Sequence, residues 1–227
     1  MAEIYLVRHG QPQWSQGELS CEEPGLTPLG AEHAKGAGQA LGRVGFTHFF
    51  ASPLRRAQET AHFIAPYVGL EPQPIPWWRE YQAKPMDQRP LEEVQEYFRL
   101  WQATALAQRQ AGPPGGESLQ ELVTRVQSGL ESLLLSLGFK YEWDGPWRKW
   151  SEPSPEIKIL LVGHTFASAM GAGYLLNLEP NPLLGEQLRL GWGAYNRVTT
   201  FPLGGGLIWR LREVDSRSHL GGLPNDL

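Results

Sequence analysis

Short apolar runs alternate along the chain with longer stretches whose apolar residues recur every three to four positions. Runs of the first kind are typical of buried strands, and the second spacing is typical of amphipathic helices. After an apolar run at residues 4–7, the spacing predicts a helix from Pro28 to about Gly42, with Thr27 as its N-cap. The run at residues 46–51 predicts a second strand, and a second helix follows it. The chain therefore begins in the order strand, helix, strand, helix.

The middle of the chain combines helical patterns with strong breakers. Two helical stretches, at about 91–110 and 118–137, are separated by Gly112-Pro113-Pro114-Gly115-Gly116. We expect them to form an inserted helical cap over about residues 80–137. A polar, Trp-rich loop is predicted at about 139–155, and its rings are expected to pin the loop to the core because each can bury a large apolar area.

The remaining elements complete an alternating order of strands and helices. They are predicted at 71–78 (an edge strand or a loop), 157–162 (a buried strand), 167–176 (a helix), and 197–201 with 207–211 (a closing strand pair). The tail after Arg212 is expected to fray. This order predicts one α/β domain over residues 1–227, a three-layer α/β/α sandwich with a mostly parallel central sheet. Ligands of such folds bind at the carboxyl ends of strands, where His9 and His164 lie.

Composition narrows the classes of function. Of the 227 residues, 41% are hydrophobic and 19% are charged, as in globular proteins. The 20 lysines and arginines stand against 24 acidic residues, and this net charge of −4 argues against a general nucleic-acid binder. The single cysteine, Cys21, predicts a reducing compartment. Neither a signal peptide nor a membrane-spanning apolar run is present, so we expect a cytoplasmic protein with no membrane partner.

Five side chains could form a phosphate site if the strand ends converge: Arg8, His9, Arg56, Glu80 and His164. An arginine fork matches phosphate oxygens and stays charged at any working pH. A neutral histidine can attack phosphorus, a second histidine can bind the equatorial oxygens, and a glutamic acid can protonate the leaving alkoxide. A metal site is not expected, because no third ligand with metal spacing accompanies the two histidines.

Four blocks in this order resemble the histidine phosphatase superfamily, in its phosphoglycerate-mutase-like group. They are Leu6-Val7-Arg8-His9-Gly10, Ser52-Pro53-Leu54-Arg55-Arg56-Ala57-Gln58-Glu59-Thr60, Gly115-Gly116-Glu117-Ser118-Leu119 and Val162-Gly163-His164-Thr165. The resemblance implies that His9 is the nucleophile that becomes phosphohistidine. It also implies that Arg8, Arg56 and His164 hold the phosphoryl group, while Arg55 is only a helix neighbour. Glu80 resembles the family's proton donor, and Asp87 is the second choice for that role.

Three positions depart from the family pattern and are candidates for a reshaped substrate pocket. Gln11 stands where glutamate is frequent, Ser15 stands where asparagine is usual, and Thr165 begins the pair that replaces Gly-Gly after the second histidine. Ser52-Pro53, in the second block, is expected to cap the helix that follows it.

The interpretation is a cofactor-independent phosphomonoester hydrolase of the histidine acid-phosphatase type, acting on a small phosphorylated metabolite. A phosphomutase of the phosphoglycerate mutase type is the first alternative, because it would share the first half-reaction. A non-catalytic phosphate-binding module is the second. The sequence leaves open which phosphate ester is bound and whether the chain forms a homodimer.

Overall fold

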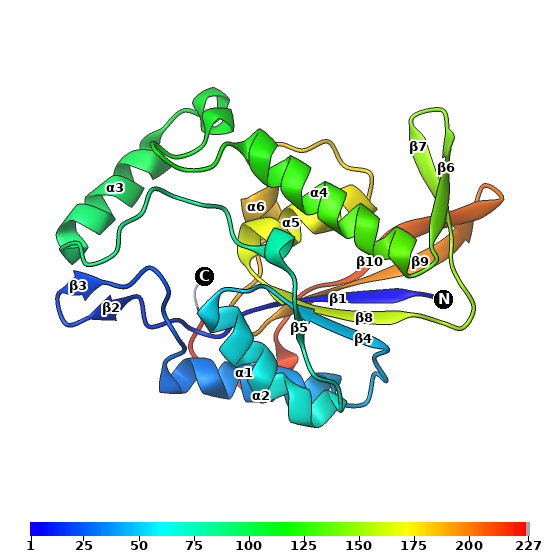
Figure 1. The fold of residues 1–227 in the computed structure, drawn as a ribbon, viewed down its shortest axis with the longest axis horizontal. Coiled ribbons are helices and arrows are strands. Elements are labelled where there is room, and N and C mark those ends of the chain that lie inside the picture. The colour runs from blue at the N-terminus through cyan, green and yellow to red at the C-terminus, as the bar shows by residue number, and fades with distance from the viewer. Residues whose placement is uncertain (226–227) are drawn as a thin grey trace.

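An eight-stranded sheet runs through the structure, a computed structural model that describes residues 1–225. The strands lie in the spatial order β5-β4-β8-β1-β9-β10-β7-β6 (Figure 1). Their bounds are Glu3–Arg8 (β1), His48–Ala51 (β4), Gln73–Pro74 (β5), Lys140–Asp144 (β6), Trp147–Ser151 (β7), Lys158–Gly163 (β8), Tyr195–Leu203 (β9) and Gly206–Ser216 (β10). A separate hairpin consists of β2 (Ser15–Gln16) and β3 (Leu19–Ser20). The edge position of β5 confirms the prediction made from its prolines.

The α/β class is confirmed, but the expectation of a mostly parallel sheet is wrong. The pairs β1–β8, β4–β8 and β4–β5 are parallel, whereas β9, β10, β7 and β6 extend the sheet in antiparallel fashion. The reason is connection length: β6 joins β7, and β9 joins β10, through tight turns at Gly145 and Gly204-Gly205, which have positive φ. Such turns allow only antiparallel pairing.

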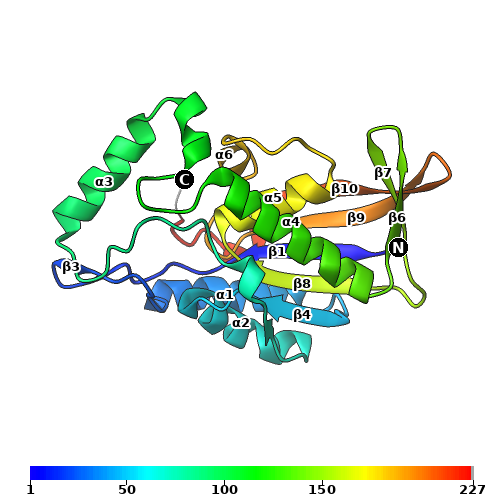
Figure 2. The same ribbon diagram turned by 45° about the horizontal axis from the view of Figure 1, so that its top comes forward.

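Helices cover both faces of the sheet. Figures 1 and 2 show α1 (Pro28–Leu41) and α2 (Arg55–Val68) on one face, and α4 (Leu119–Ser136) and α5 (Thr165–Leu175) on the other. Thr27 is the N-cap of α1, as predicted, and its hydroxyl accepts the N–H of Gly30. The other helical elements are α3 (Leu91–Ala103), α6 (Leu184–Gln187), η1 (Pro76–Trp78), η2 (Leu106–Ala111) and η3 (Ser218–Leu220).

Alternate side chains of strand β1 pack against the two layers of helices, one layer on each face of the sheet. Ile4 and Leu6 belong to the apolar cluster under α4 and α5, whereas Tyr5 and Val7 belong to the cluster under α1 and α2. Successive side chains of a strand point to opposite faces, so a continuous apolar run here means burial on both sides.

The segment predicted as an inserted cap has two parts with different packing. Helix α4 buries Leu122, Val126, Leu130 and Leu134 and contacts α5, so it belongs to the layer over the sheet. Helix α3 has no buried residue, and in Figure 2 it stands beyond the end of the sheet, above the β2–β3 hairpin. Among residues 1–225, no helix combines the length and apolar character needed to span a bilayer.

The Trp-rich segment is a β-hairpin rather than a loop. Strands β6 and β7 pair along their length and lie at the sheet edge, and only Leu207↔Trp150 joins β7 to β10. Trp150 is buried in the core, but Trp143 and Trp147 are exposed, so one of the three rings pins the segment. Charged residues alternate with the aromatic ones here, and the polar positions obscured the strand pattern.

The expectation of a frayed tail after Arg212 is also wrong. Strand β10 continues to Ser216, and η3 follows it. Nε2 of His33 then lies 2.9 Å from the carbonyl oxygen of Pro224, and the amide of Asn225 bonds both the backbone N–H and C=O of Trp192. The described tail is therefore fastened to α1 and to the loop before β9.

Close contact between Gly30 and the chain after β1 fixes where α1 lies. A Cβ added at Gly30 would stand 2.1 Å from the carbonyl oxygen of Gln11. We expect Gly30→Ala to lower the free energy of unfolding by about 1–3 kcal/mol, because the backbone itself must move. Urea unfolding followed by circular dichroism measures this. Gly36→Ala on the same helix is the control, since its nearest neighbour is 3.3 Å away; equal effects at both positions would contradict the packing argument.

Candidate active site

Two histidines meet at the carboxyl ends of adjacent parallel strands. Strand β1 ends at Arg8 and β8 ends at Gly163, and these two residues are register partners. His9 and His164 follow them directly, and the backbone N–H of His9 donates to the carbonyl of Gly163 at 3.0 Å. The imidazole centroids are 5.1 Å apart. Both rings can therefore touch one tetrahedral anion, which is the convergence that the sequence predicted.

The ring of His9 is held in one tautomer. Its Nδ1 lies 2.8 Å from the carbonyl oxygen of Gly10, and because a carbonyl only accepts, Nδ1 carries the proton. Burial, reinforced by the charges of Arg56 and Arg8, holds the pKa of His9 well below its usual 6.5. At neutral pH the ring is uncharged, and its Nε2 has a free lone pair.

The ring of His164 is held through Nε2, whereas the ring of His9 is held through Nδ1. Its Nε2 lies 2.7 Å from the hydroxyl of Ser52, while its buried Nδ1 bonds no atom of residues 1–225. Burial lowers the pKa of His164 well below 6.5, and the nearby charge of Arg56 lowers it further. A buried ring nitrogen without a protein partner is the position at which a ligand oxygen gains most.

Arg8 and Arg56 bring positive charge to the two rings. Arg8 donates from Nη1 to the carbonyl of Leu190 at 2.6 Å, and its guanidinium lies over the ring of Trp192. Arg56 is only 5% exposed, its guanidinium lies 4.9 Å from the centroid of Trp14, and its buried Nε has no partner in the described chain. Burial lowers the pKa of Arg56 to about 10, so its charge persists at neutral pH.

The neighbouring Arg55 is not part of this cluster. It is exposed on α2 and pairs with Glu59 at 2.8 Å, one turn along the helix. The two arginines of the Ser52–Thr60 block therefore differ as expected from the sequence: Arg56 lies in the cluster, and Arg55 does not.

Two hydroxyls of the Ser52–Thr60 block support the site, and sequence reasoning missed both roles. Ser52 was expected to cap α2, but the N-cap is Leu54 and the Ser52 hydroxyl bonds His164. Thr60 accepts the N–H of Gly10 at 3.0 Å and donates to the carbonyl of Arg56 at 2.7 Å. Thr60 thus links the chain after His9 to the turn of α2 that carries Arg56. The only sequence signal for these two roles was that Ser52 and Thr60 lie in a block that resembles the superfamily.

Glu80, rather than Asp87, lies beside His164. One oxygen of Glu80 accepts the N–H groups of Tyr81 and Ala167 at 2.8 and 3.1 Å, and the other accepts the N–H of Phe166 at 3.2 Å. The carboxyl group of Glu80 therefore caps the N-terminus of α5, whose first N–H groups have no partner within the helix. Asp87 is exposed and accepts the N–H of Glu22 at 3.0 Å.

The three departures from the family pattern occupy different surroundings. The side-chain carbonyl of Gln11 accepts from the Thr27 hydroxyl at 2.7 Å, so it is committed to α1. Thr165 is the buried first residue of α5, directly after His164. Ser15 begins the β2–β3 hairpin and pairs with Ser20. Thr165 thus directly follows His164 and Gln11 lies two residues after His9, whereas Ser15 belongs to the separate hairpin.

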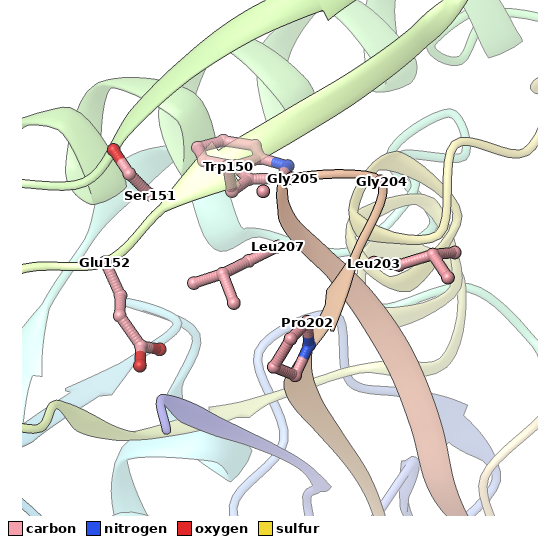
Figure 3. A pocket seen from close by; sticks show the side chains of 9 residues that line it. Trp150, Ser151, Glu152, Pro202, Leu203, Gly204, Gly205 and Leu207 are labelled. Carbon is pink, nitrogen blue, oxygen red and sulfur yellow. The ribbon is translucent and has the colours of Figure 1, made fainter.

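A cavity of about 550 Å³ elsewhere in the fold has different chemistry. Figure 3 shows Trp150, Pro202, Leu203 and Leu207 on its walls, between β7 and the β9–β10 hairpin. Its Glu152 accepts from the backbone N–H of Ala2 and from the hydroxyl of Thr200, both at 2.7 Å, so this carboxylate serves the start of β1. In the part of the chain that the structure covers, no three His, Cys, Asp or Glu side chains gather in an arrangement that could hold a metal ion.

Comparison with known proteins agrees with this geometry. The sequence profile of the histidine phosphatase superfamily (branch 1) matches residues 4–200. The chain belongs to the histidine phosphatase superfamily. It shares 30% identity over 185 residues with "Probable phosphoglycerate mutase GpmB" of Yersinia enterocolitica, covering 80% of this chain and 78% of that protein. The protein of the same name from Enterobacter sp. strain 638 is 34% identical over 140 residues, covering 59% of this chain; the match spans 64% of that relative, just under two thirds of its length.

Solved structures show that the fold is that of the superfamily. The mycobacterial glucosyl-3-phosphoglycerate phosphatase in complex with inorganic phosphate superposes with a TM-score of 0.73 at 22% identity, covering 97% of this chain and 99% of that one. The alpha-ribazole phosphatase of Shigella flexneri gives a TM-score of 0.68 at 21% identity, covering 95% and 96%.

The hydroxyl of Ser52 offers a direct test of the candidate anion site in this member of the superfamily. Ser52→Ala leaves Nε2 of His164 without its partner, so the ring loses its orientation. We expect affinity for inorganic phosphate, measured by titration calorimetry, to fall about tenfold, which corresponds to about 1.4 kcal/mol. Ser52→Thr, which keeps the hydroxyl, is the control. Unchanged affinity in the alanine variant would show that the bond does not position His164.

The low pKa of His164 predicts a dependence of stability on pH. In the unfolded chain the imidazole titrates near 6.5, whereas in the folded chain it stays neutral well below that pH. Below pH 6.5 the unfolded state therefore binds a proton that the folded state does not, and stability falls as the pH falls. We expect His164→Gln to reduce the slope of unfolding free energy between pH 6.5 and 5.5 by about 1 kcal/mol per pH unit.

Urea unfolding in phosphate-free buffer measures both slopes. Between pH 7.5 and 8.5 neither state binds this proton, so the wild type and the variant should have the same slope there. Equal slopes between pH 6.5 and 5.5 would mean that His164 is protonated in the folded protein.

Proposed function

We propose that this chain is a phosphomonoester hydrolase in which His9 is transiently phosphorylated. The observation that carries the proposal is the pairing of two buried, neutral imidazoles, 5.1 Å apart, with the guanidinium of Arg56 beside them. A neutral imidazole is a nucleophile, and the surrounding positive charge selects for phosphate.

In the first half-reaction Nε2 of His9 attacks phosphorus. The N–P bond forms as the P–O bond of the ester breaks, and the leaving alcohol oxygen takes a proton from Glu80. The Nδ1–H bond to Gly10 fixes the ring and stabilises the positive charge that develops on it. Arg8, Arg56 and Nδ1 of His164 hold the equatorial oxygens.

In the second half-reaction water replaces the alcohol. Glu80, now a carboxylate, takes a proton from the attacking water, the N–P bond breaks, and inorganic phosphate leaves with His9 neutral again. The proton balance closes with these side chains alone, so the proposed reaction needs no metal or organic cofactor.

The substrate that we propose is a small phosphorylated metabolite. The superfamily match supports phosphoryl chemistry, and solved relatives carry the names of phosphatases for glucosyl-3-phosphoglycerate and alpha-ribazole. Cys21 is a free thiol, which supports a reducing compartment such as the cytoplasm.

Phosphomutase activity is the second candidate, because the relatives at 30% and 34% identity carry the name of a phosphoglycerate mutase. Product analysis with 3-phosphoglycerate separates the two. A hydrolase releases glycerate and phosphate, and a mutase yields 2-phosphoglycerate.

Trapping the intermediate tests the proposed mechanism. Wild type quenched during turnover of radiolabelled glycerol 3-phosphate should carry acid-labile, base-stable label on His9, and turnover should persist in EDTA. His9→Ala should carry no label and lose at least about 1,000-fold in kcat, because the nucleophile is gone. Phosphate binding without any turnover would instead indicate a non-catalytic binding module, and loss of activity in EDTA would overturn the mechanism.

A further inference from the structure

A third arginine, Arg79, lies next to the proposed phosphoryl site but is bonded differently from Arg8 and Arg56. It directly precedes Glu80 and follows the buried Trp78. Its side chain is 40% exposed, and its Nη2 lies 3.4 Å from Oε1 of Glu23, which is 51% exposed. Its Nε is buried and bonds no atom of residues 1–225. Arg79 and Glu23 therefore form a solvent-facing ion pair.

The ion pair is close enough to act on the buried groups. The charge of Arg79 contributes to the lowered pKa of His164 and of Arg56, whereas the charge of Glu23 opposes the shift at Arg56. Arg79 directly precedes Glu80, and Oε2 of Glu23 lies 3.5 Å from the backbone nitrogen of Arg55, the chain neighbour of Arg56. The half-exposed pair therefore lies on the solvent side of the proposed phosphoryl site, where we expect the alcohol part of a bound ester to extend.

The loop that carries Glu23 is fixed in position. Glu59 on α2 accepts the backbone N–H of Leu26 at 2.6 Å, and the carbonyl of Gly25 accepts the N–H of Gln13 at 2.9 Å. Oε2 of Glu23 itself lies 3.5 Å from the backbone nitrogen of Arg55. Glu23 is thus held beside Arg79 by a contact of its own side chain and by bonds of the two residues Gly25 and Leu26 that follow it.

Arg55, the chain neighbour of Arg56, and Arg79, the chain neighbour of Glu80, are each paired with a carboxylate of the same chain: Arg55 with Glu59 and Arg79 with Glu23. A carboxylate or second phosphate on the substrate would meet Glu23 before it could bond Arg79. We infer that Glu23 is a specificity-determining residue that directs the site toward phosphate esters whose alcohol part carries no second negative charge. This inference rests on the proposed phosphatase function and narrows its substrate class.

A matched pair of esters tests the inference. Glycerol 3-phosphate and 3-phosphoglycerate differ only in a hydroxymethyl group against a carboxylate. Glu23→Gln removes the competing charge and leaves Arg79 available to the carboxylate. We expect the ratio of kcat/KM for 3-phosphoglycerate to that for glycerol 3-phosphate to rise about five- to tenfold, the effect of one unit charge at contact distance in a water-exposed site.

Two further variants separate the local effect from net charge. Glu22→Gln removes the same charge one residue away, from an exposed side chain, and should change the ratio less than twofold. Adding Arg79→Gln to Glu23→Gln should abolish the gain, because the carboxylate then has no partner. A ratio that does not rise in Glu23→Gln, or that rises equally in Glu22→Gln, overturns the inference.

If the proposed phosphatase function is wrong, the role of Glu23 can still be tested by binding measurements. If the wild type releases phosphate from neither ester, calorimetric titration of the same two esters gives the ratio of their affinities in each variant. A five- to tenfold rise of that ratio in Glu23→Gln alone supports the role of Glu23 without turnover, and an unchanged ratio rejects it.

Discussion

The register between β1 and β8 is the constraint on which the site depends. Because Arg8 stands opposite Gly163 in parallel strands, the next residues, His9 and His164, leave the sheet side by side. Successive side chains of a strand alternate between faces, so a slip of one residue would separate the rings. Gly163 also allows Trp78 to approach: a Cβ there would stand 2.2 Å from the indole nitrogen. The position of Gly163, and with it that of His164, thus depends both on sheet register and on close packing against Trp78.

Burial keeps the imidazoles of His9 and His164 neutral, but burying the charge of Arg56 beside them lowers the stability of the fold. Arg56 is almost fully buried beside two imidazoles, and burying a charge without an ionic partner is unfavourable. The fold offsets part of this cost by keeping both rings neutral. The remaining positive charge favours an anion, so the same low-dielectric environment that costs stability would strengthen binding of the proposed phosphoryl group.

The sequence predicted those features that follow from local rules. Strand ends located His9 and His164, whereas the resemblance to the superfamily, not a local rule, distinguished Arg56 from Arg55. What it could not predict depends on tertiary contacts. A serine before a helix is ordinarily a cap, and only the fold shows that the Ser52 hydroxyl serves His164. Of the antiparallel half of the sheet, the closing pair β9 and β10 was predicted. The hairpin formed by β6 and β7 was missed because it alternates charged with aromatic residues, as a solvated loop also can.

In the proposed reaction, recognition of the phosphoryl group and recognition of the alcohol would rest on different kinds of structure. The first uses buried side chains at strand ends, whose positions are fixed by sheet register and by bonds such as that between Thr60 and Gly10. The second faces Arg79 and Glu23, which are half-exposed and carried by connecting segments. A change on those segments alters one exposed ion pair without moving the sheet, whereas a change at the strand ends alters the register itself. Substrate choice can therefore diverge between relatives that keep the same reaction.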